Sequence, residues 1–196
     1  MLGASLGARA YLDRVCREIQ RVELDQVENL SNLIEAAYQS GRTVFVIGNG
    51  GSAANASHLC EDLNKCTLRD FDAPRRLRVL SLTDNTAGIM AWANDEGYDR
   101  VFVEQLKTYA SPGDLLLAIS GSGNSPNIIK AVEWANGHGL TTVGVTGFGG
   151  GQLKDLAGHS LHVAVDDMGL CESLHQVVFH WIIGDLFRRI SGPVPA

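Results

Sequence analysis

The chain has 196 residues, of which 45% are hydrophobic and 19% are charged, and its formal net charge is −6. This composition is typical of a globular protein with one domain, and the negative charge argues against nucleic acid or an acidic membrane as a partner. No apolar run reaches the ~20 residues that a membrane span requires, and no secretory signal segment is visible. The four cysteines form no C-x-x-C pair, which favours reduced thiols and a cytoplasmic location.

Residues 1–41 contain two stretches in which apolar residues recur at helical spacing. The first stretch covers residues 12–22 and the second covers residues 27–38, with Gly41 placed to end the second helix. The apolar faces of these helices can pack on the sheet of the same chain or on a second subunit, and the sequence leaves both alternatives open.

A buried strand over residues 44–47 leads directly into a glycine-rich turn, GNGGS, at residues 48–52. A helix follows this turn. A turn of this kind leaves backbone N–H groups free to bind an anion, most often a phosphate. Two helical turns further on, His58 and Asp62 stand at i and i+4, so they project from the same face of the helix. The sequence therefore predicts a first phosphate cradle at residues 48–52, with an ionisable pair beyond it.

The middle of the chain alternates strands and helices. We expect a strand over residues 77–82, a helix over 86–93, a polar loop over 94–99, an amphipathic segment over 101–109 and a strand over 114–119.

The strand over residues 114–119 ends in a second polar turn, SGSGNS, at residues 120–125. A helix follows to about residue 136, with Ser125 suited to the N-cap and Pro126 to the first helical turn. Because hydroxyl groups and a helix N-terminus converge here, we expect a second phosphate cradle at residues 120–125.

Two more strands are predicted over residues 141–145 and 161–165, with another glycine-rich turn at 147–151. Strands that alternate with helices form a parallel sheet that is covered on both faces. Ligands in such folds bind beyond the carboxyl ends of the strands, which is where both cradles lie.

A long helix is predicted over residues 170–190. At 100° per residue, Glu172, Gln176 and His180 fall within about 80° of one another on its surface. This grouping favours a functional role for His180, whereas His175 is expected to be a packing residue.

Together, the segment GNGGSAANASHLCEDL, the turn SGSGNS and the helix ESLHQVVFH resemble the sugar isomerase (SIS) family, and within it the phosphoheptose isomerases. The resemblance implies a three-layer α/β sandwich of flavodoxin-like type, with a five-stranded parallel sheet flanked by helices. It implies one domain over residues 1–196, with N-terminal helices over 1–41 and an α/β core over 42–191. It also implies a homotetramer with sites at the subunit interfaces, and interconversion of sedoheptulose 7-phosphate and D-glycero-D-manno-heptose 7-phosphate.

The resemblance assigns roles to positions that match the family motifs. It implies one Zn²⁺ per subunit, held by a catalytic cluster that can also contact the substrate. The substrate-contacting positions of the first cradle are Asn49, Gly50 and Gly51, with Ser52 beside them. The phosphate-holding positions are Ser120, Gly121, Ser122 and Ser125, and the residues at the sugar end are Asn94 and Asp95. The catalytic cluster consists of His58, Asp62, Glu172 and His180.

This sequence departs from the family pattern at three places. Asp62 replaces the usual glutamate, Glu172 replaces the usual glutamine, and residues 64–66 read Asn-Lys-Cys instead of Thr-Gly-Arg. These changes leave open an isomerase of another sugar phosphate, or a phosphosugar-binding protein that acts in regulation or assembly without catalysis.

The cluster suits aldose–ketose isomerisation, which needs a base beside a carbonyl, an acid to protonate oxygens and a means to stabilise an enediolate. We assign Asp62 as the base and His180 as its acid–base partner. The two histidines and two carboxylates would suit a tetrahedral zinc site equally well, and the metal would then polarise the carbonyl. The sequence alone does not decide between these two uses.

Overall fold

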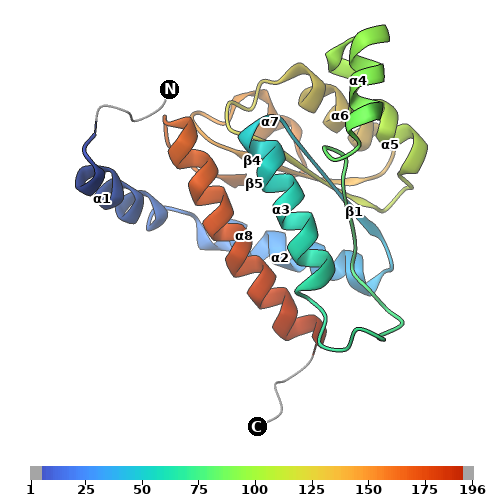
Figure 1. The fold of residues 1–196 in the computed structure, drawn as a ribbon, viewed down its shortest axis with the longest axis horizontal. Coiled ribbons are helices and arrows are strands. Elements are labelled where there is room, and N and C mark those ends of the chain that lie inside the picture. Colours follow the sequence, from blue (N-terminus) through green and yellow to red (C-terminus); the bar gives the residue numbers. More distant parts are fainter. Residues whose placement is uncertain (1–5, 192–196) are drawn as a thin grey trace.

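A five-stranded parallel sheet with helices on both faces forms the body of the protein, in a computed structural model that describes residues 6–191 (Figure 1). The strands lie in the order β2-β1-β3-β4-β5. They are β1 (Thr43–Gly48), β2 (Arg78–Ser81), β3 (Leu115–Ser120), β4 (Thr141–Thr146) and β5 (His159–His162). The helices are α1 (Ala8–Ile19), α2 (Leu24–Gln39), α3 (Gly51–Lys65), α4 (Thr86–Asp95), α5 (Val103–Tyr109), α6 (Pro126–Gly137), α7 (Gly151–Leu156) and α8 (Met168–Ser191), with a 3-10 turn, η1, at Tyr98–Arg100. The predicted fold class is confirmed.

The sheet separates two apolar cores, because successive side chains of a strand point to opposite faces. Val44 and Val46 of β1 belong to the core beneath α2, α3 and α8. Phe45 and Ile47 belong to the core on the other face, which α5 and α6 cover. All four side chains are at most 1% exposed. The continuous apolar run in β1 is thus explained by burial on both faces.

The neighbouring strands β1 and β3 send the chain to opposite faces of the sheet. Helix α3 follows β1 and buries Leu59 and Leu63 in the first core, whereas α6 follows β3 and buries Ile128 and Val132 in the second. Two adjacent parallel strands whose connections diverge in this way leave a crevice at their carboxyl ends, which is the usual ligand site of such sheets. The topology therefore brings the two predicted cradles together.

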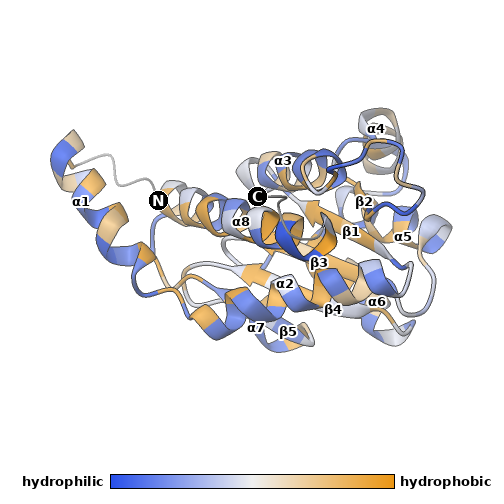
Figure 2. Cartoon of the chain, turned by 90° about the horizontal axis from the view of Figure 1, so that it is seen from below, coloured by the Kyte–Doolittle hydropathy of each residue, from blue (hydrophilic) through white to orange (hydrophobic). Residues whose placement is uncertain are grey.

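Helices α3 and α8 lie side by side over the first core (Figure 1). Helix α1, by contrast, projects from the body of the molecule and has no buried residue (Figure 2). Within residues 6–191, no helix is long and apolar enough to cross a membrane.

Three predicted boundaries are wrong. The first helical stretch is predicted over residues 12–22, whereas α1 ends at Ile19. The last strand is His159–His162 rather than residues 161–165, and the chain already turns where Val165 N–H bonds to the Val163 carbonyl. Val163 and Val165 are apolar because they are buried, not because the strand extends through them. Similarly, the segment predicted as a polar loop from residue 94 begins inside α4, which ends at Asp95.

Candidate active site

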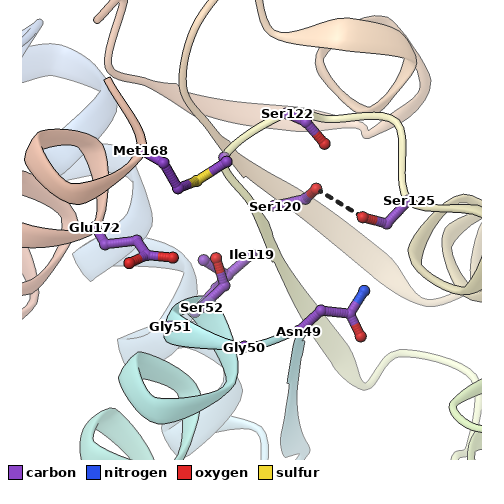
Figure 3. A pocket seen from close by; sticks show the side chains of 11 residues that line it. Asn49, Gly50, Gly51, Ser52, Ile119, Ser120, Ser122, Ser125, Met168 and Glu172 are labelled. Atoms are coloured by element: carbon purple, nitrogen blue, oxygen red, sulfur yellow. Dashed lines mark hydrogen bonds between the residues drawn. The ribbon is translucent and has the colours of Figure 1, made fainter. Parts of the chain in front are cut away.

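The two predicted cradles face each other across a cavity of about 230 Å³ at the carboxyl ends of β1 and β3 (Figure 3). Most of the residues predicted to contact substrate line this cavity. They are Asn49, Gly50, Gly51, Ser52, Ser120, Gly121, Ser122, Ser125 and Glu172. Ile119 and Met168 also line it and were not predicted, because apolar side chains in a strand and a helix carry no sign of a ligand site.

Glycines allow both turns to be this tight. A Cβ atom on Gly48 would lie 2.6 Å from the backbone oxygen of Ser52, in the first turn of α3. Gly123 has a φ of +67°, and a Cβ there would overlap the backbone carbonyl of Gly150. Both positions therefore require glycine for the backbone to keep its path.

The second cradle presents hydroxyl groups toward the cavity. Ser120 Oγ lies 3.5 Å from Ser125 Oγ and also accepts a hydrogen bond from Gly123 N–H at 3.1 Å. Ser125 is the N-cap residue of α6, and Pro126 follows it in the first turn, as predicted. The N-termini of α3 and α6 lie beside the cavity, and each places the positive end of its helix dipole there. This combination suits a phosphate group.

A second group of polar side chains lies where α3 packs on α8. His58 Nε2 is 3.3 Å from Asp62 Oδ2, and His180 Nε2 is 3.9 Å from the same oxygen. The two imidazole rings meet edge to face, with their centroids 5.2 Å apart. The histidine side chains are 48% and 53% exposed, whereas Asp62 is 18% exposed. The structure thus brings together three of the four residues predicted for the catalytic cluster.

These three residues fit a divalent metal. Each offers one ligand atom, and the three atoms lie within 4.8 Å of one another. Two imidazoles and one carboxylate form the donor set of catalytic zinc centres, which keep a fourth position open for water or substrate. The geometry therefore supports a metal site at His58, Asp62 and His180.

Glu172 is not part of this three-residue group, contrary to the prediction that it completes the metal set. Its carboxylate lies against Gly51, where a Cβ atom would overlap it, and it lines the cradle cavity. Burial raises the pKa of the Glu172 carboxyl above its ordinary value. The family motif predicted that Glu172 would join the histidines. Its side chain turns instead toward Gly51 at the N-terminus of α3.

Gln176 occupies the position that the prediction gave to Glu172. Its amide nitrogen lies 3.1 Å from His58 Nδ1 and 3.1 Å from His180 Nε2. An amide nitrogen can only donate, so Gln176 donates to one nitrogen of each ring and holds the two imidazoles in place. The helical spacing had placed Gln176 on the same face as His180, and this was the signal that could have identified it.

A wider cavity of about 560 Å³ lies between the cradles and His180 of the three-residue group. It is lined by Asn55, Gln176 and His180, and it shares Gly51 and Glu172 with the cradle cavity. A molecule bound in the cradles can therefore extend along α3 toward the histidines.

The remaining predicted residues lie apart from these cavities. Asn94 and Asp95 are exposed at the end of α4, where Asn94 donates a hydrogen bond of 2.7 Å to Asp95. Neither lines the cradle cavity, and their role at the sugar end stays a prediction. His175 is fully buried and its Nε2 lies 3.1 Å from the carbonyl oxygen of Thr146, as expected of a packing residue. Burial lowers the pKa of His175 to about 4.

Comparison with known proteins identifies relatives over nearly the whole chain. The model of the SIS domain matches residues 9–147. A probable phosphoheptose isomerase from Thermoplasma acidophilum is 36% identical over 177 residues, which are 90% of this chain and 96% of the relative. A phosphoheptose isomerase from Mycobacterium bovis is 40% identical over 173 residues, 88% of this chain and 87% of the relative.

A solved structure has the same fold. The phosphoheptose isomerase from Neisseria gonorrhoeae superposes with a TM-score of 0.82 at 26% identity, covering 90% of this chain and 93% of that one. The chain belongs to the SIS domain family. Within this family it is similar to phosphoheptose isomerases, as the three sequence motifs predicted.

Proposed function

We propose that this protein is an aldose–ketose isomerase of phosphosugars that interconverts sedoheptulose 7-phosphate and D-glycero-D-manno-heptose 7-phosphate. The observation that carries the proposal is an acid–base group on α3 and α8 near a double phosphate cradle. His180 of this group lines a wide cavity that shares Gly51 and Glu172 with the cradle cavity. The relatives named phosphoheptose isomerases support the choice of substrate, because they match 88–90% of this chain at 36–40% identity.

The cradles hold the phosphate, and the sugar extends along α3. A helix rises about 1.5 Å per residue, so His58 lies roughly 10 Å along the axis from Gly51. This distance is comparable with the length of a seven-carbon chain. Binding of the phosphate at the remote end therefore positions the reacting carbons beside the acid–base group.

Isomerisation of the ketose requires a proton to leave C1 while the electrons of that bond form a double bond to C2. Asp62 takes this proton, and the C2 oxygen acquires the negative charge of the enediolate. His180 donates a proton to the C2 oxygen and removes the proton of the C1 hydroxyl. Return of the proton from Asp62 to C2 then gives the aldose. Gln176 keeps the His180 ring oriented through its 3.1 Å hydrogen bond.

We further propose that each subunit holds one Zn²⁺ at His58, Asp62 and His180. When bound, the metal supplies a Lewis acid that polarises the carbonyl and stabilises the enediolate. In that form these three side chains would act as ligands, and Glu172, a further carboxyl that lines the wide cavity beside His180, would carry the proton transfers that Asp62 and His180 perform without the metal.

Self-association belongs to the proposal because the acid–base group is half-exposed in the single chain. Electrostatic catalysis is most effective where water is excluded. Around His180 lie apolar side chains that face solvent: Val177 is 49% exposed, Trp181 is 45% exposed and Leu24 is 71% exposed. Helix α1 projects beside them with no buried residue. A second copy of the chain that covers this surface would close the site, and we propose a homotetramer with the sites at its interfaces.

A charge placed on this surface tests the assembly. Trp181→Lys should dissociate the oligomer, as measured by light scattering, and should lower turnover because the histidines become exposed to water. Tyr109→Lys places the same charge on an equally solvent-facing residue of α5 and should leave the oligomer intact. An assembled and fully active Trp181→Lys variant would contradict the interface.

The proposed activity is tested with purified protein and sedoheptulose 7-phosphate, with product followed by NMR, in Zn²⁺-loaded and chelated samples. We expect aldose formation that falls on chelation and returns with Zn²⁺. Binding of the sugar phosphate without any product would favour a regulatory or assembly role.

All four cysteines are free, in agreement with action in the cytoplasm, where thiols stay reduced.

A further inference from the structure

Tyr98 in η1 contacts the first cradle through its hydroxyl group, although it does not itself line the cradle cavity. Its Oη donates a hydrogen bond of 3.0 Å to the side-chain oxygen of Asn49. The phenol ring is 54% exposed, so the ring contributes little to the core. The contact joins residues that are 49 positions apart in the sequence, at the point where the first cradle begins.

A backbone donor fixes the direction of every hydrogen bond around Asn49. The N–H of Ile128 is shared between the Ser125 carbonyl oxygen and Asn127 Oδ1, each at 3.0 Å. An NH₂ group could not face this N–H, so this atom of the buried Asn127 side chain is the oxygen. The other end of Asn127 is therefore the NH₂ group, and it donates to Asn49 Oδ1 at 2.9 Å. Asn49 Nδ2 in turn donates to Asn127 Oδ1 at 2.9 Å. Because Asn49 Oδ1 accepts from Asn127, the Tyr98 hydroxyl can only be a second donor to it.

This arrangement leaves Asn49 with one free hydrogen-bonding group. Both lone pairs of Oδ1 are used by Tyr98 and Asn127, and one N–H of Nδ2 is used by Asn127. The second N–H is free for a ligand. Figure 3 shows the nitrogen end of Asn49 on the side of Ser125, with its oxygen turned away. Asn49 can therefore donate to a ligand oxygen but has no acceptor to offer to a ligand hydroxyl.

Local structure holds Tyr98 in place. Gly97 has a φ of +111°, which allows the chain to leave α4 and enter η1 directly. Asp99 forms an ion pair with Lys130 of α6, and Arg100 forms one with Glu104 at 2.9 Å. Lys130 lies three residues after Asn127, on the same side of α6. The same helix thus anchors both Asn127 and the turn that carries Tyr98.

We propose that Tyr98 is a positioning residue that acts through Asn49: its hydroxyl holds the Asn49 amide so that the free N–H points at an oxygen of the bound phosphosugar. The inference rests on the proposed function for the identity of the ligand. The loss of the hydroxyl would free one lone pair of Asn49 Oδ1, leave the amide held by Asn127 alone, loosen its orientation and weaken ligand binding equally in the ground state and the transition state. Such a loss raises KM and leaves kcat nearly unchanged.

A double-mutant cycle with Tyr98→Phe and Asn49→Ala tests this role, with sedoheptulose 7-phosphate as substrate. Tyr98→Phe alone should raise KM about three- to tenfold, as expected for one hydrogen bond, and should change kcat by less than about twofold. The same substitution in the Asn49→Ala background should change KM by less than about twofold, because its effect is transmitted by Asn49. Tyr109→Phe, which removes a hydroxyl from a tyrosine with the same 54% exposure, is the matched control and should change neither constant.

Three results would overturn the inference. The same rise in KM in both backgrounds would mean that Tyr98 acts without Asn49. An unchanged KM for Tyr98→Phe would mean that the hydrogen bond has no effect on binding. A fall in melting temperature, together with a fall in kcat as large as the rise in KM, would assign Tyr98 a structural role. If the wild type shows no turnover, the proposed function fails, and the same cycle is measured as the Kd of sedoheptulose 7-phosphate by calorimetry with the same expected non-additivity.

Discussion

Asp62→Asn is the substitution that probes the acid–base group most sharply. The change keeps the shape of the side chain but removes the negative charge that lies 3.3 Å from His58 Nε2 and 3.9 Å from His180 Nε2. An amide cannot accept a proton from carbon and is a poor metal ligand. General base catalysis contributes about 10²- to 10⁴-fold, so we expect kcat to fall by that factor, which corresponds to ~3–5 kcal/mol of transition-state stabilisation.

Binding and stability should change little in the same variant. The hydroxyl groups of the second cradle do not touch Asp62, so the Kd for the phosphosugar should stay within about threefold. The contacts of Asp62 with the half-exposed histidines contribute at most about 1 kcal/mol to folding. The control is Glu61→Gln, which removes a charge from the adjacent exposed residue of α3.

The assay measures kcat by NMR and the Kd by calorimetry for the wild type and both variants. Full turnover by Asp62→Asn would refute the assignment of Asp62. A loss of binding equal to the loss of turnover would show that Asp62 holds substrate in the ground state instead.

Three further predictions concern the cradles and the core. Ser120→Ala combined with Ser125→Ala should raise KM about 10²- to 10⁴-fold, because two hydrogen bonds to a charged group are lost, and an unchanged KM would contradict the phosphate site. Gly123→Ala should lower the free energy of unfolding by about 2–4 kcal/mol, measured by urea denaturation, because of its positive φ and its overlap with the Gly150 carbonyl. The pKa of His175, about 4 when folded, lies below its unfolded value of about 6.5, so between these pH values the unfolded chain binds more protons and stability rises with pH. Acidification from pH 7 to 5 should therefore cost the wild type about 2 kcal/mol more than His175→Gln, and equal losses in both proteins would contradict a buried neutral imidazole.

Local patterns were sufficient to predict the sheet and both cradles. The buried strands β1 and β3 are continuous apolar runs. A polar turn follows each strand, and the residues of the turn indicate where the next helix begins. Ser125 and Pro126 show this most clearly, since the N-cap and first-turn positions were predicted from two adjacent residues. Strand β5 was misplaced because Val163 and Val165 are buried without being extended in the sheet.

Contacts between distant segments could not be predicted in the same way. Whether Glu172 or Gln176 meets His58 depends on how α8 packs on α3, and the two residues differ by only one turn of the same helix face. The hydrogen bond from Tyr98 to Asn49 depends on the path of the chain between α4 and α5. Helical spacing places Gln176 on the face of His180 but does not show that it meets His58, and the contact of Tyr98 with Asn49 has no signature in local spacing or composition.

Proton transfer during isomerisation tests the central claim most directly. Sedoheptulose 7-phosphate is incubated with the Zn²⁺-loaded protein in D₂O, and the product is examined by NMR. The proposed mechanism predicts an aldose whose C2 carries either the hydrogen removed from C1 or solvent deuterium that has exchanged onto the carboxyl group, and no such product with Asp62→Asn. A folded protein that binds the sugar phosphate but forms no aldose, or an Asp62→Asn variant that forms aldose at the rate of the wild type, would contradict it.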